Sequence, residues 1–390
     1  MNTLKPHALL APTLVALLSA CGGGGGDEPQ VNGAATALAA SSETAHAADA
    51  DLSGDSPTAS ALALKRTSAP TAVPVPAPAP APANKGAAVV LNTSIPDSAR
   101  IAAATATAQS TTNLCAPIRP FYWEIGTGAG KAVSGSLTSP TVATKYTSTM
   151  PMGYASASKW MYGAYVTQRK SGVLSADDVK FLTFKSGYTS FSNCLQNQTV
   201  DQCLAYQGNG TYVPTTDGQF YYSGGHMEKH ASLMGLGGMN NQTLAATIQG
   251  QLGSDVKIGY SQPMLAGGGY GTPDSYAIFL RKLINKQLKM GDMLSANAVC
   301  TNRMTCPGQA LSAPIPPSES WHYGIGHWIE DDPVVGDGAF SSPGYLGFYP
   351  WVDASRTYYG IVARVMPQGG LASMQCGRLI RKAWETGTAM

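Results

Sequence analysis

The sequence predicts a domain of mixed helices and strands, in the α+β or α/β class. Residues 120–130 are aromatic and end in glycines, which is typical of a strand that enters a turn. Residues 358–365 form a largely apolar run that is typical of a buried strand. Between these segments, apolar residues recur at helical spacing. Strands at both ends with helices between them favour a mixed domain.

Four helices are expected in the folded part of the chain. Residues 158–170 and 274–288 carry apolar side chains at helical spacing, and the second segment becomes basic towards its end. Ser175 is the expected N-cap of another helix, because Asp178 follows it by three residues as in a capping box. Residues 370–384 form the C-terminal helix, with apolar side chains on or near one face.

The N-terminus has the order of features found in export signals. Lys5 precedes an apolar run at residues 8–18, which is too short to remain in a bilayer as a span. Small residues stand directly before Cys21, as in the bacterial lipobox. We therefore expect a signal peptide at residues 1–20 and a lipid on Cys21. The lipid would anchor the protein in the bacterial cell envelope, at the periplasmic or surface side of the outer membrane. The alternative is a plain secretory signal with an incidental cysteine.

Residues 21–109 have the composition of a disordered tether. Residues 22–109 are mostly Ala, Pro, Gly, Ser and Thr and contain no aromatic side chain. Such a segment buries too little apolar surface to offset the chain entropy lost on folding. The folded domain is accordingly expected at residues 110–390, a length that suits one large domain.

Charge and cysteine content exclude several classes of partner. The net charge is +2 and no run of Lys or Arg is long enough to indicate nucleic acid. Six cysteines follow Cys21, and an even number in an exported protein indicates disulfides. No Cys-x-x-Cys pair is present, so we expect neither a metal nor any other cofactor.

Ser156 and Lys159 form a Ser-x-x-Lys motif at the start of an expected helix. One helical turn places residues i and i+3 on the same face, so the lysine amine can approach the serine oxygen. A serine hydroxyl becomes a good nucleophile only when a base takes its proton, and a lysine with a lowered pKa is such a base. Chance matches to this motif are common, and the alternative is a helix-capping serine beside a solvated lysine.

Seven segments, in order, resemble the motifs of one enzyme superfamily. They are YASASKW (154–160), KSGVLSADD (170–178), LTFKSGY (182–188), FYYS (220–223), LAGGGYGTPD (265–274), YGIGHW (323–328) and SSPGYLGF (341–348). The chain thereby resembles the serine β-lactamase and penicillin-binding-protein superfamily over about residues 120–366. The resemblance implies an α+β fold. Its central antiparallel sheet is flanked by N- and C-terminal helices, and an all-helical lobe is added.

The resemblance also implies catalytic roles. Ser156 is the acylated nucleophile, Lys159 is its proton partner, and Tyr222 relays a proton to the leaving group. The backbone N–H groups of Ser156 and Tyr345 form the oxyanion hole. The alternative for Tyr222 is an ordinary core or surface tyrosine.

Two positions depart from the family pattern. The asparagine two residues after the tyrosine is Gly224, and the lysine or histidine of the third motif is Ser342. We place His226, Ser342 and Gly344 on the substrate-binding side. His226 is either a proton donor in the space of the missing asparagine or a structural histidine. No role is assigned to His322 or His327.

Three disulfides are expected. Cys194–Cys203 and Cys300–Cys306 are close in sequence, so their loops close at little entropic cost. Cys115–Cys376 remain, and the resemblance places the N-terminal strand and the C-terminal helix near these cysteines together on the sheet.

The expected function is hydrolysis of an ester or amide in a small molecule or peptide. The missing cation at Ser342 weakens the case for β-lactamase or D-amino-peptidase activity, because that cation holds a substrate carboxylate. The alternatives are such a peptidase or β-lactamase, or a catalytically inactive binding protein of the cell envelope.

Overall fold

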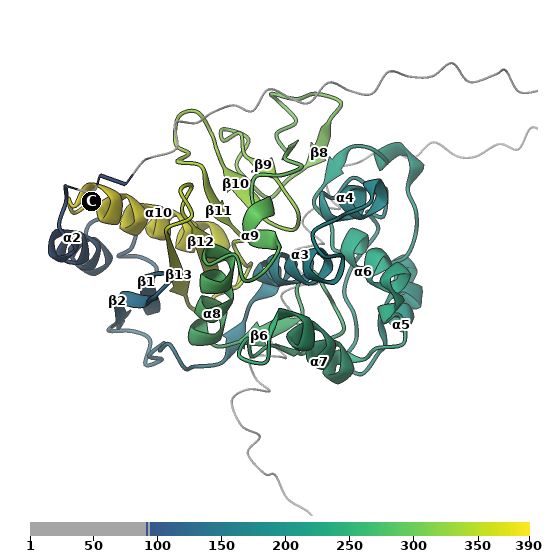
Figure 1. Ribbon diagram of the computed structural model, residues 1–390, viewed down its shortest axis with the longest axis horizontal. Coiled ribbons are helices and arrows are strands. Elements are labelled where there is room, and N and C mark those ends of the chain that lie inside the picture. Colours follow the sequence, from purple (N-terminus) through teal and green to yellow (C-terminus); the bar gives the residue numbers. More distant parts are fainter. Residues whose placement is uncertain (1–90, 93) are drawn as a thin grey trace, which may run out of the picture.

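An eight-stranded antiparallel sheet forms the centre of the molecule (Figure 1). The computed structural model describes residues 91–92 and 94–390. The strand order is β2-β1-β13-β12-β11-β10-β9-β7. The bounds are β1 Phe121–Thr127, β2 Gly130–Leu137, β7 Val299–Cys300, β9 His322–Tyr323, β10 Trp328–Glu330, β11 Ala339–Ser341, β12 Tyr349–Val352 and β13 Tyr358–Ala363. The expected signal peptide, the lipid site at Cys21 and the tether up to residue 90 lie outside the described residues.

Helices cover both faces of this sheet. In β13, Tyr358 donates a hydrogen bond to Glu385 of α10 (Gly370–Thr386). The next residue, Tyr359, accepts a hydrogen bond from Arg281 of α8 (Pro273–Ile284) at 3.2 Å. Because successive strand residues point to opposite faces, α10 and α8 lie on opposite sides of the sheet. The expected mixed fold around an antiparallel sheet is therefore confirmed.

Helix α2 (Asp97–Gln109) packs against α10 at one end of the molecule (Figure 1). The prediction that residues 97–109 belong to a disordered tether is wrong. Alanine has the highest helix propensity, and the small buried side chains of α2 allow a close helix contact without aromatic residues. Arg100, which is 1% exposed, donates from Nη1 to the carbonyls of Trp384 and Glu385 at 2.6 and 3.0 Å. The folded domain thus includes α2 instead of beginning at residue 110.

The two ends of the described chain meet beside α2. The Met390 N–H donates to Thr107 Oγ1 at 2.8 Å, and Asn113 Nδ2 donates to the Met390 carbonyl at 2.9 Å. Ile95 packs so closely on Gly387 that any side chain added there would need it to shift. The C-terminus is therefore held against the N-terminal helix.

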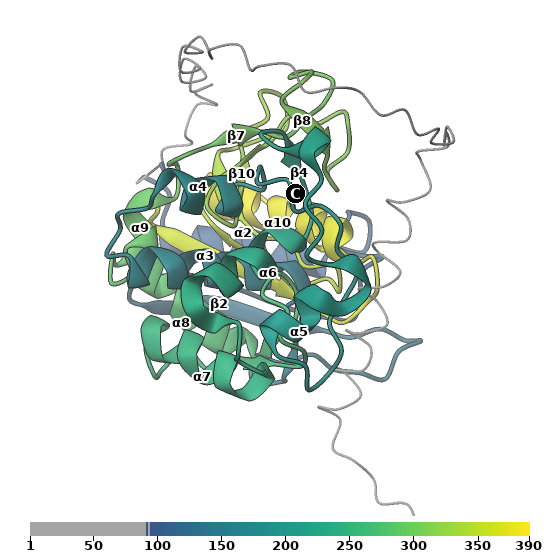
Figure 2. The same cartoon turned by 90° about the vertical axis from the view of Figure 1, so that its right-hand side faces the viewer.

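A helical lobe occupies the other end of the molecule, and α3 (Ser158–Arg169) lies between the lobe and the sheet (Figures 1 and 2). Residues 158–167 of α3 are all buried, as expected for a helix in the centre of a fold. The lobe contains α4 Ala176–Leu182, α5 Val200–Ala205, α6 Gly225–Ala231 and α7 Asn241–Leu252. Among the described helices, none combines the length and the apolar character needed to cross a membrane.

Short strands connect the lobe to the sheet. A three-stranded sheet is formed by β3 Met152–Gly153, β5 Gly259–Tyr260 and β6 Gly269–Gly271. A parallel pair is formed by β4 Phe220–Tyr221 and β8 Ala310–Ser312. The short helix α9 spans Met290–Met293. These elements bring residues 152–159, 220–222 and 259–271 to the boundary between the sheet and the lobe.

The helices expected from the sequence are present, with one shorter than predicted. The capping box of Ser175 and Asp178 starts α4. Helix α8 ends at Ile284 instead of residue 288, because Lys286 adopts a left-handed backbone with φ of 54°. A non-glycine residue in that conformation cannot continue a right-handed helix.

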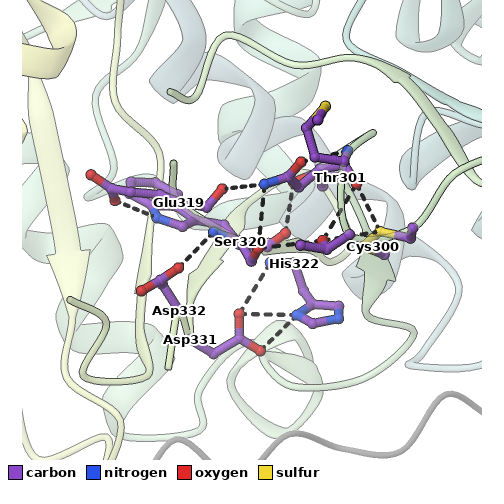
Figure 3. Close-up of a disulfide and its surroundings, with 12 residues drawn as sticks. Cys300, Thr301, Glu319, Ser320, His322, Asp331 and Asp332 are labelled. Atoms are coloured by element: carbon purple, nitrogen blue, oxygen red, sulfur yellow. Dashed lines mark hydrogen bonds and ion pairs between the residues drawn. A yellow bond between two sulfur atoms is a disulfide. The ribbon is translucent and has the colours of Figure 1, made fainter. Parts of the chain in front are cut away.

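The three expected disulfides, Cys115–Cys376, Cys194–Cys203 and Cys300–Cys306, are all present. Cys115–Cys376 joins the loop after α2 to α10 across 261 residues of sequence. Figure 3 shows the surroundings of Cys300, where the His322 ring pairs with Asp331 and the Ser320 N–H donates to Asp332. These contacts fix the loops at the edge of the sheet.

A buried ion network fastens α10 to the sheet. Arg381 is fully buried and donates to Glu330 of β10 and to Asp337, at 2.9 and 2.6 Å. The guanidinium groups of Arg381 and Arg378 lower the pKa of Glu330 to about 2, although burial alone would raise it. Each charge therefore has a partner, which is the condition for tolerating charges in a protein interior.

Candidate functional site

Ser156 lies in a short 3-10 helix, Ala155–Ala157, that connects β3 to α3. Ala155 has φ of 49°, a left-handed conformation that costs free energy for a residue with a β-carbon. Ser156 is partly exposed, whereas both of its neighbours are buried. The strained turn thus presents the serine hydroxyl at the start of α3.

The amine of Lys159 lies against the Ser156 hydroxyl. Lys159 Nζ is 3.0 Å from Ser156 Oγ and 2.8 Å from the carbonyl oxygen of Ala266. Lys159 is 5% exposed and forms no ion pair among the described residues. Burial disfavours the charged amine and lowers the pKa of Lys159 to about 7. A large share of this amine is therefore uncharged at neutral pH.

Tyr222 is the third side chain of the site, beside Ser156 and Lys159. It follows β4, and the Lys159 amine lies over its ring, 4.7 Å from the centroid. The ring stacks on Trp328 of β10 with centroids 5.3 Å apart. Burial raises the pKa of Tyr222 to about 12, while hydrogen bonds with Ser156 and Trp328 act in the opposite direction. The phenol is therefore protonated at neutral pH, in hydrogen-bond reach of the serine.

The third motif packs against the backbone of the serine. Gly344 lies so close to the Tyr154 carbonyl that any side chain there would collide with it. Tyr345 packs against Ala155 and Leu346. The expected oxyanion donors, the N–H groups of Ser156 and Tyr345, are therefore carried by neighbouring segments. Their contact with a substrate oxygen remains a prediction.

Ser342 and Gly344, expected on the substrate-binding side, lie against the backbone around Ser156, and their contact with a substrate stays a prediction. The Ser342 hydroxyl is 1% exposed and donates to the carbonyl of Ser156 at 2.9 Å, so it holds the protein backbone. Gly344 is buried, and its lack of a side chain allows the close backbone approach. Both residues position the Ser156 turn.

His226 has the contacts of a structural histidine, which is one of the two roles predicted for it. It is fully buried, with Nδ1 2.7 Å from Ser186 Oγ and Nε2 3.0 Å from the Tyr221 carbonyl. Its ring stacks on Phe184. Burial lowers the pKa of His226 to about 3, so it stays neutral. With both ring nitrogens engaged, it has no free position for a substrate.

Gly224, which stands where the family has asparagine, is crowded by apolar side chains. A β-carbon on Gly224 would lie 3.0 Å from the Phe191 ring and 3.3 Å from Ala266 Cβ. Phe191 and Ala266 thus fill the space in which an asparagine side chain would begin. The wall at this position is apolar.

Three further residues belong to the site, and the sequence analysis assigned them no role. Ala266 contributes its backbone carbonyl, and a backbone contact of this kind cannot be predicted from the residue type. Trp328 is the last residue of the YGIGHW motif, and its ring stacks on the ring of Tyr222. Glu228 is a buried acid on α6, one turn beyond the second motif. No signal in the sequence indicated its burial, because α6 (GHMEKHA) also carries two histidines and a lysine.

Neither a family model nor a curated protein matches this sequence. Similar solved structures exist at low identity. The unliganded simvastatin synthase of Aspergillus terreus is 12% identical, with a TM-score of 0.50, over 74% of this chain and 98% of that chain. EstCE1, a hydrolase with promiscuous acyltransferase activity, is 14% identical, with a TM-score of 0.49, over 74% and 99%. The octameric penicillin-binding protein homologue of Pyrococcus abyssi is 14% identical, with a TM-score of 0.48, over 69% and 74%. The predicted resemblance is therefore confirmed at the level of the fold.

Proposed function

We propose that this chain, which has the β-lactamase-type serine hydrolase fold, cleaves an ester or amide through an acyl-enzyme on Ser156. The observation that carries the proposal is the buried Lys159 amine, 3.0 Å from Ser156 Oγ and with a pKa lowered to about 7. An ordinary lysine is almost fully charged at neutral pH and cannot accept a proton. A lysine of pKa about 7 can act as a general base there.

Acylation then follows from the positions of the three side chains. Lys159 takes the Ser156 proton while Oγ forms a bond to the substrate carbonyl carbon, and the carbonyl oxygen becomes an oxyanion. The N–H groups of Ser156 and Tyr345 would stabilise that oxyanion. Collapse of the tetrahedral intermediate breaks the bond to the leaving group. Tyr222 donates its proton to this group and regains one from the lysine ammonium, whose Nζ lies 4.7 Å from its ring centroid.

Deacylation uses the same groups in reverse. Water adds to the acyl carbon, its proton passes to the Tyr222–Lys159 pair, and Ser156 Oγ leaves with a proton. No residue outside the site is needed to balance the protons. Because the nucleophile and its base act as a unit, the loss of either should remove most of the rate acceleration.

The wall of the site favours uncharged acyl groups. The third-motif position is the buried Ser342, and the second-motif position is Gly224 against Phe191. Neither position supplies a positive charge for a substrate carboxylate. A β-lactamase or D-amino-peptidase needs such a charge, so a neutral ester or amide fits better. The other alternative is an inactive binding protein, and its function would not require a lysine with a lowered pKa at this position.

Covalent labelling tests the proposal. The purified domain from residue 91 onwards is incubated with a fluorophosphonate, and intact-mass analysis follows. One adduct, mapped to Ser156 and lost in Ser156→Ala, is expected. A parallel screen with short-chain esters, amides, D-amino peptides and a chromogenic β-lactam identifies the substrate class. Absence of both the adduct and turnover would contradict the proposal and favour the inactive binding protein.

We also propose that the protein is held at a bacterial envelope membrane by a lipid on Cys21. Small residues before a cysteine at the end of a short apolar run support this location. Metabolic labelling with a palmitate analogue should mark the full chain but not Cys21→Ser. Labelling that persists in Cys21→Ser would contradict the proposal.

A further inference from the structure

The loop between β5 and β6 holds the carbonyl that contacts Lys159. Ala266 lies in this loop, and its carbonyl oxygen is 2.8 Å from Lys159 Nζ. Within the loop, the N–H groups of Met264 and Gly268 bond to other loop carbonyls at 2.7 and 2.8 Å. The N–H of Leu265, directly before Ala266, instead donates to Glu228 Oε2 at 3.0 Å. A side chain of α6 therefore fixes the Met264–Leu265 peptide, two peptide units before the carbonyl that contacts Lys159.

Glu228 has no charged partner for its carboxyl group. It is fully buried, and it forms no ion pair among the residues that the structure describes. The titratable groups that face it are Tyr162 of α3 and Tyr260 of β5, whose own pKa values are raised by burial. Burial likewise raises the pKa of Glu228 well above its ordinary value. Burial therefore favours the neutral form of this carboxyl group, which accepts the Leu265 N–H.

A disulfide supports the same loop from the other side of Glu228. Cys194 Sγ lies 3.8 Å from Glu228 Oε1 and 3.7 Å from the Pro263 carbonyl. Cys194 and Cys203 pack with Phe191 and Met264 in one apolar cluster. The two sulfurs and the Glu228 carboxyl lie within 4.8 Å of one another, but bonded sulfurs offer no thiolate to a metal ion. The Cys194–Cys203 disulfide and Glu228 therefore support the loop between β5 and β6.

We propose that Glu228 is a positioning residue for the reaction at Ser156. Its carboxyl holds the Leu265 N–H and thereby sets the Ala266 carbonyl against the Lys159 amine. This inference rests on the proposed function. Without Glu228, the buried Leu265 N–H would lose its partner, and the loop would have to move or admit water. Water at the lysine would restore the hydration of the ammonium form, so the base would be lost at neutral pH.

The pH dependence of Ser156 acylation by a fluorophosphonate tests this role. In Glu228→Ala, we expect the midpoint of the acid limb to move up by about one pH unit or more, with about tenfold slower labelling at neutral pH. Glu228→Gln should keep the parent midpoint, because its neutral carbonyl also accepts the Leu265 N–H. If Glu228→Ala does not fold, Glu228→Met fills a similar volume without a good acceptor and gives the same measurement.

Glu124 supplies the matched control. It is a buried acid on β1, bonded to the hydroxyls of Tyr122 and Tyr359, and has no contact with the loop. Glu124→Ala should lower the melting temperature without moving the midpoint. If Glu228→Ala is destabilised in the same way and keeps its midpoint, Glu228 is only structural and the inference is overturned. If Glu228→Gln shifts as far as Glu228→Ala, an ionised carboxylate is required and the inference is also overturned.

Infrared difference spectroscopy gives a readout that does not depend on activity. The parent protein at neutral pH should show a protonated carboxyl stretch that is absent from Glu228→Gln. A carboxylate band in its place would contradict the neutral acid. If the parent protein is not labelled at Ser156 at all, the proposed function fails, whereas the infrared result still reports on Glu228.

Discussion

The proposed chemistry depends on the transfer of a proton from Ser156 to Lys159. Ser156→Ala and Lys159→Ala should each remove nearly all hydrolysis, by a factor of ~10⁴ or more, because nucleophile and base act together. Both variants should keep the parent circular dichroism spectrum. Turnover of the best ester from the screen is the measurement.

Ser158→Ala is the control for this pair. The Ser158 hydroxyl is buried and bonded to the Ala155 carbonyl and the Gly269 N–H, so its loss should affect stability more than chemistry. If Ser158→Ala abolished activity and Ser156→Ala did not, the assigned nucleophile would be wrong.

The acid side of the pH profile should report Lys159. Its pKa is lowered to about 7, so the uncharged base predominates above that pH and is lost below it. We expect kcat/KM to rise through about pH 7 and to level off on the alkaline side. His226, whose pKa is lowered to about 3, should not contribute to this limb. A midpoint near the ordinary lysine value would show that the amine is solvated.

Among the secondary-structure elements, we expect β11 and the turn after it to disfavour substrates that carry a carboxylate. Ser342 follows β11, and its hydroxyl donates a hydrogen bond to the Ser156 carbonyl. A charge-assisted hydrogen bond contributes roughly 1.5–3 kcal/mol, and this position cannot make one with a carboxylate. Acylation by ordinary penicillins should therefore be weak or absent in a gel assay with fluorescent penicillin. Labelling at micromolar concentration would show that another cation reaches the site.

Helix α2 should be required for a stable domain. A chain that starts at residue 110 leaves the partners of Arg100, the carbonyls at the end of α10, without their donor. It also exposes the α10 surface that α2 covers. We expect this truncation to melt at least several degrees lower than a chain that starts at residue 91. Equal melting temperatures would show that α2 contributes nothing to the fold.

For the fold as a whole, the Cys115–Cys376 bridge should be the most stabilising of the disulfides. It spans 261 residues of sequence, whereas Cys300–Cys306 spans 6. The chain-entropy model gives about 5 kcal/mol for the long loop and about 2 kcal/mol for the short one. Paired Cys→Ala replacements, measured by urea unfolding, should follow that order. A larger loss from the short loop would show that native contacts outweigh chain entropy.

The features that were predictable from the sequence are those with a local pattern. Ser156 and Lys159 are one helical turn apart, and the Ser175–Asp178 capping box marks the start of α4. The features that were missed depend on partners distant in the chain. The Ala-rich segment of α2 packs against α10, which lies far away in the chain. The choice between the two roles of His226 could not be made from the sequence, because its partner Ser186 lies 40 residues away.

The packing of α2 on α10, together with the Cys115–Cys376 disulfide, also affects how the domain would respond to mechanical force. A pull applied at residue 91 would act first on α2, which is hydrogen-bonded to the end of α10 through Arg100. The next point along the chain is Cys115, from which the covalent bridge transmits tension directly to Cys376 in α10. The path therefore reaches the C-terminal helix before it reaches β1, and Ser156 lies outside it. A domain held by its N-terminal end could be dragged or sheared while the geometry of its catalytic serine stays unchanged.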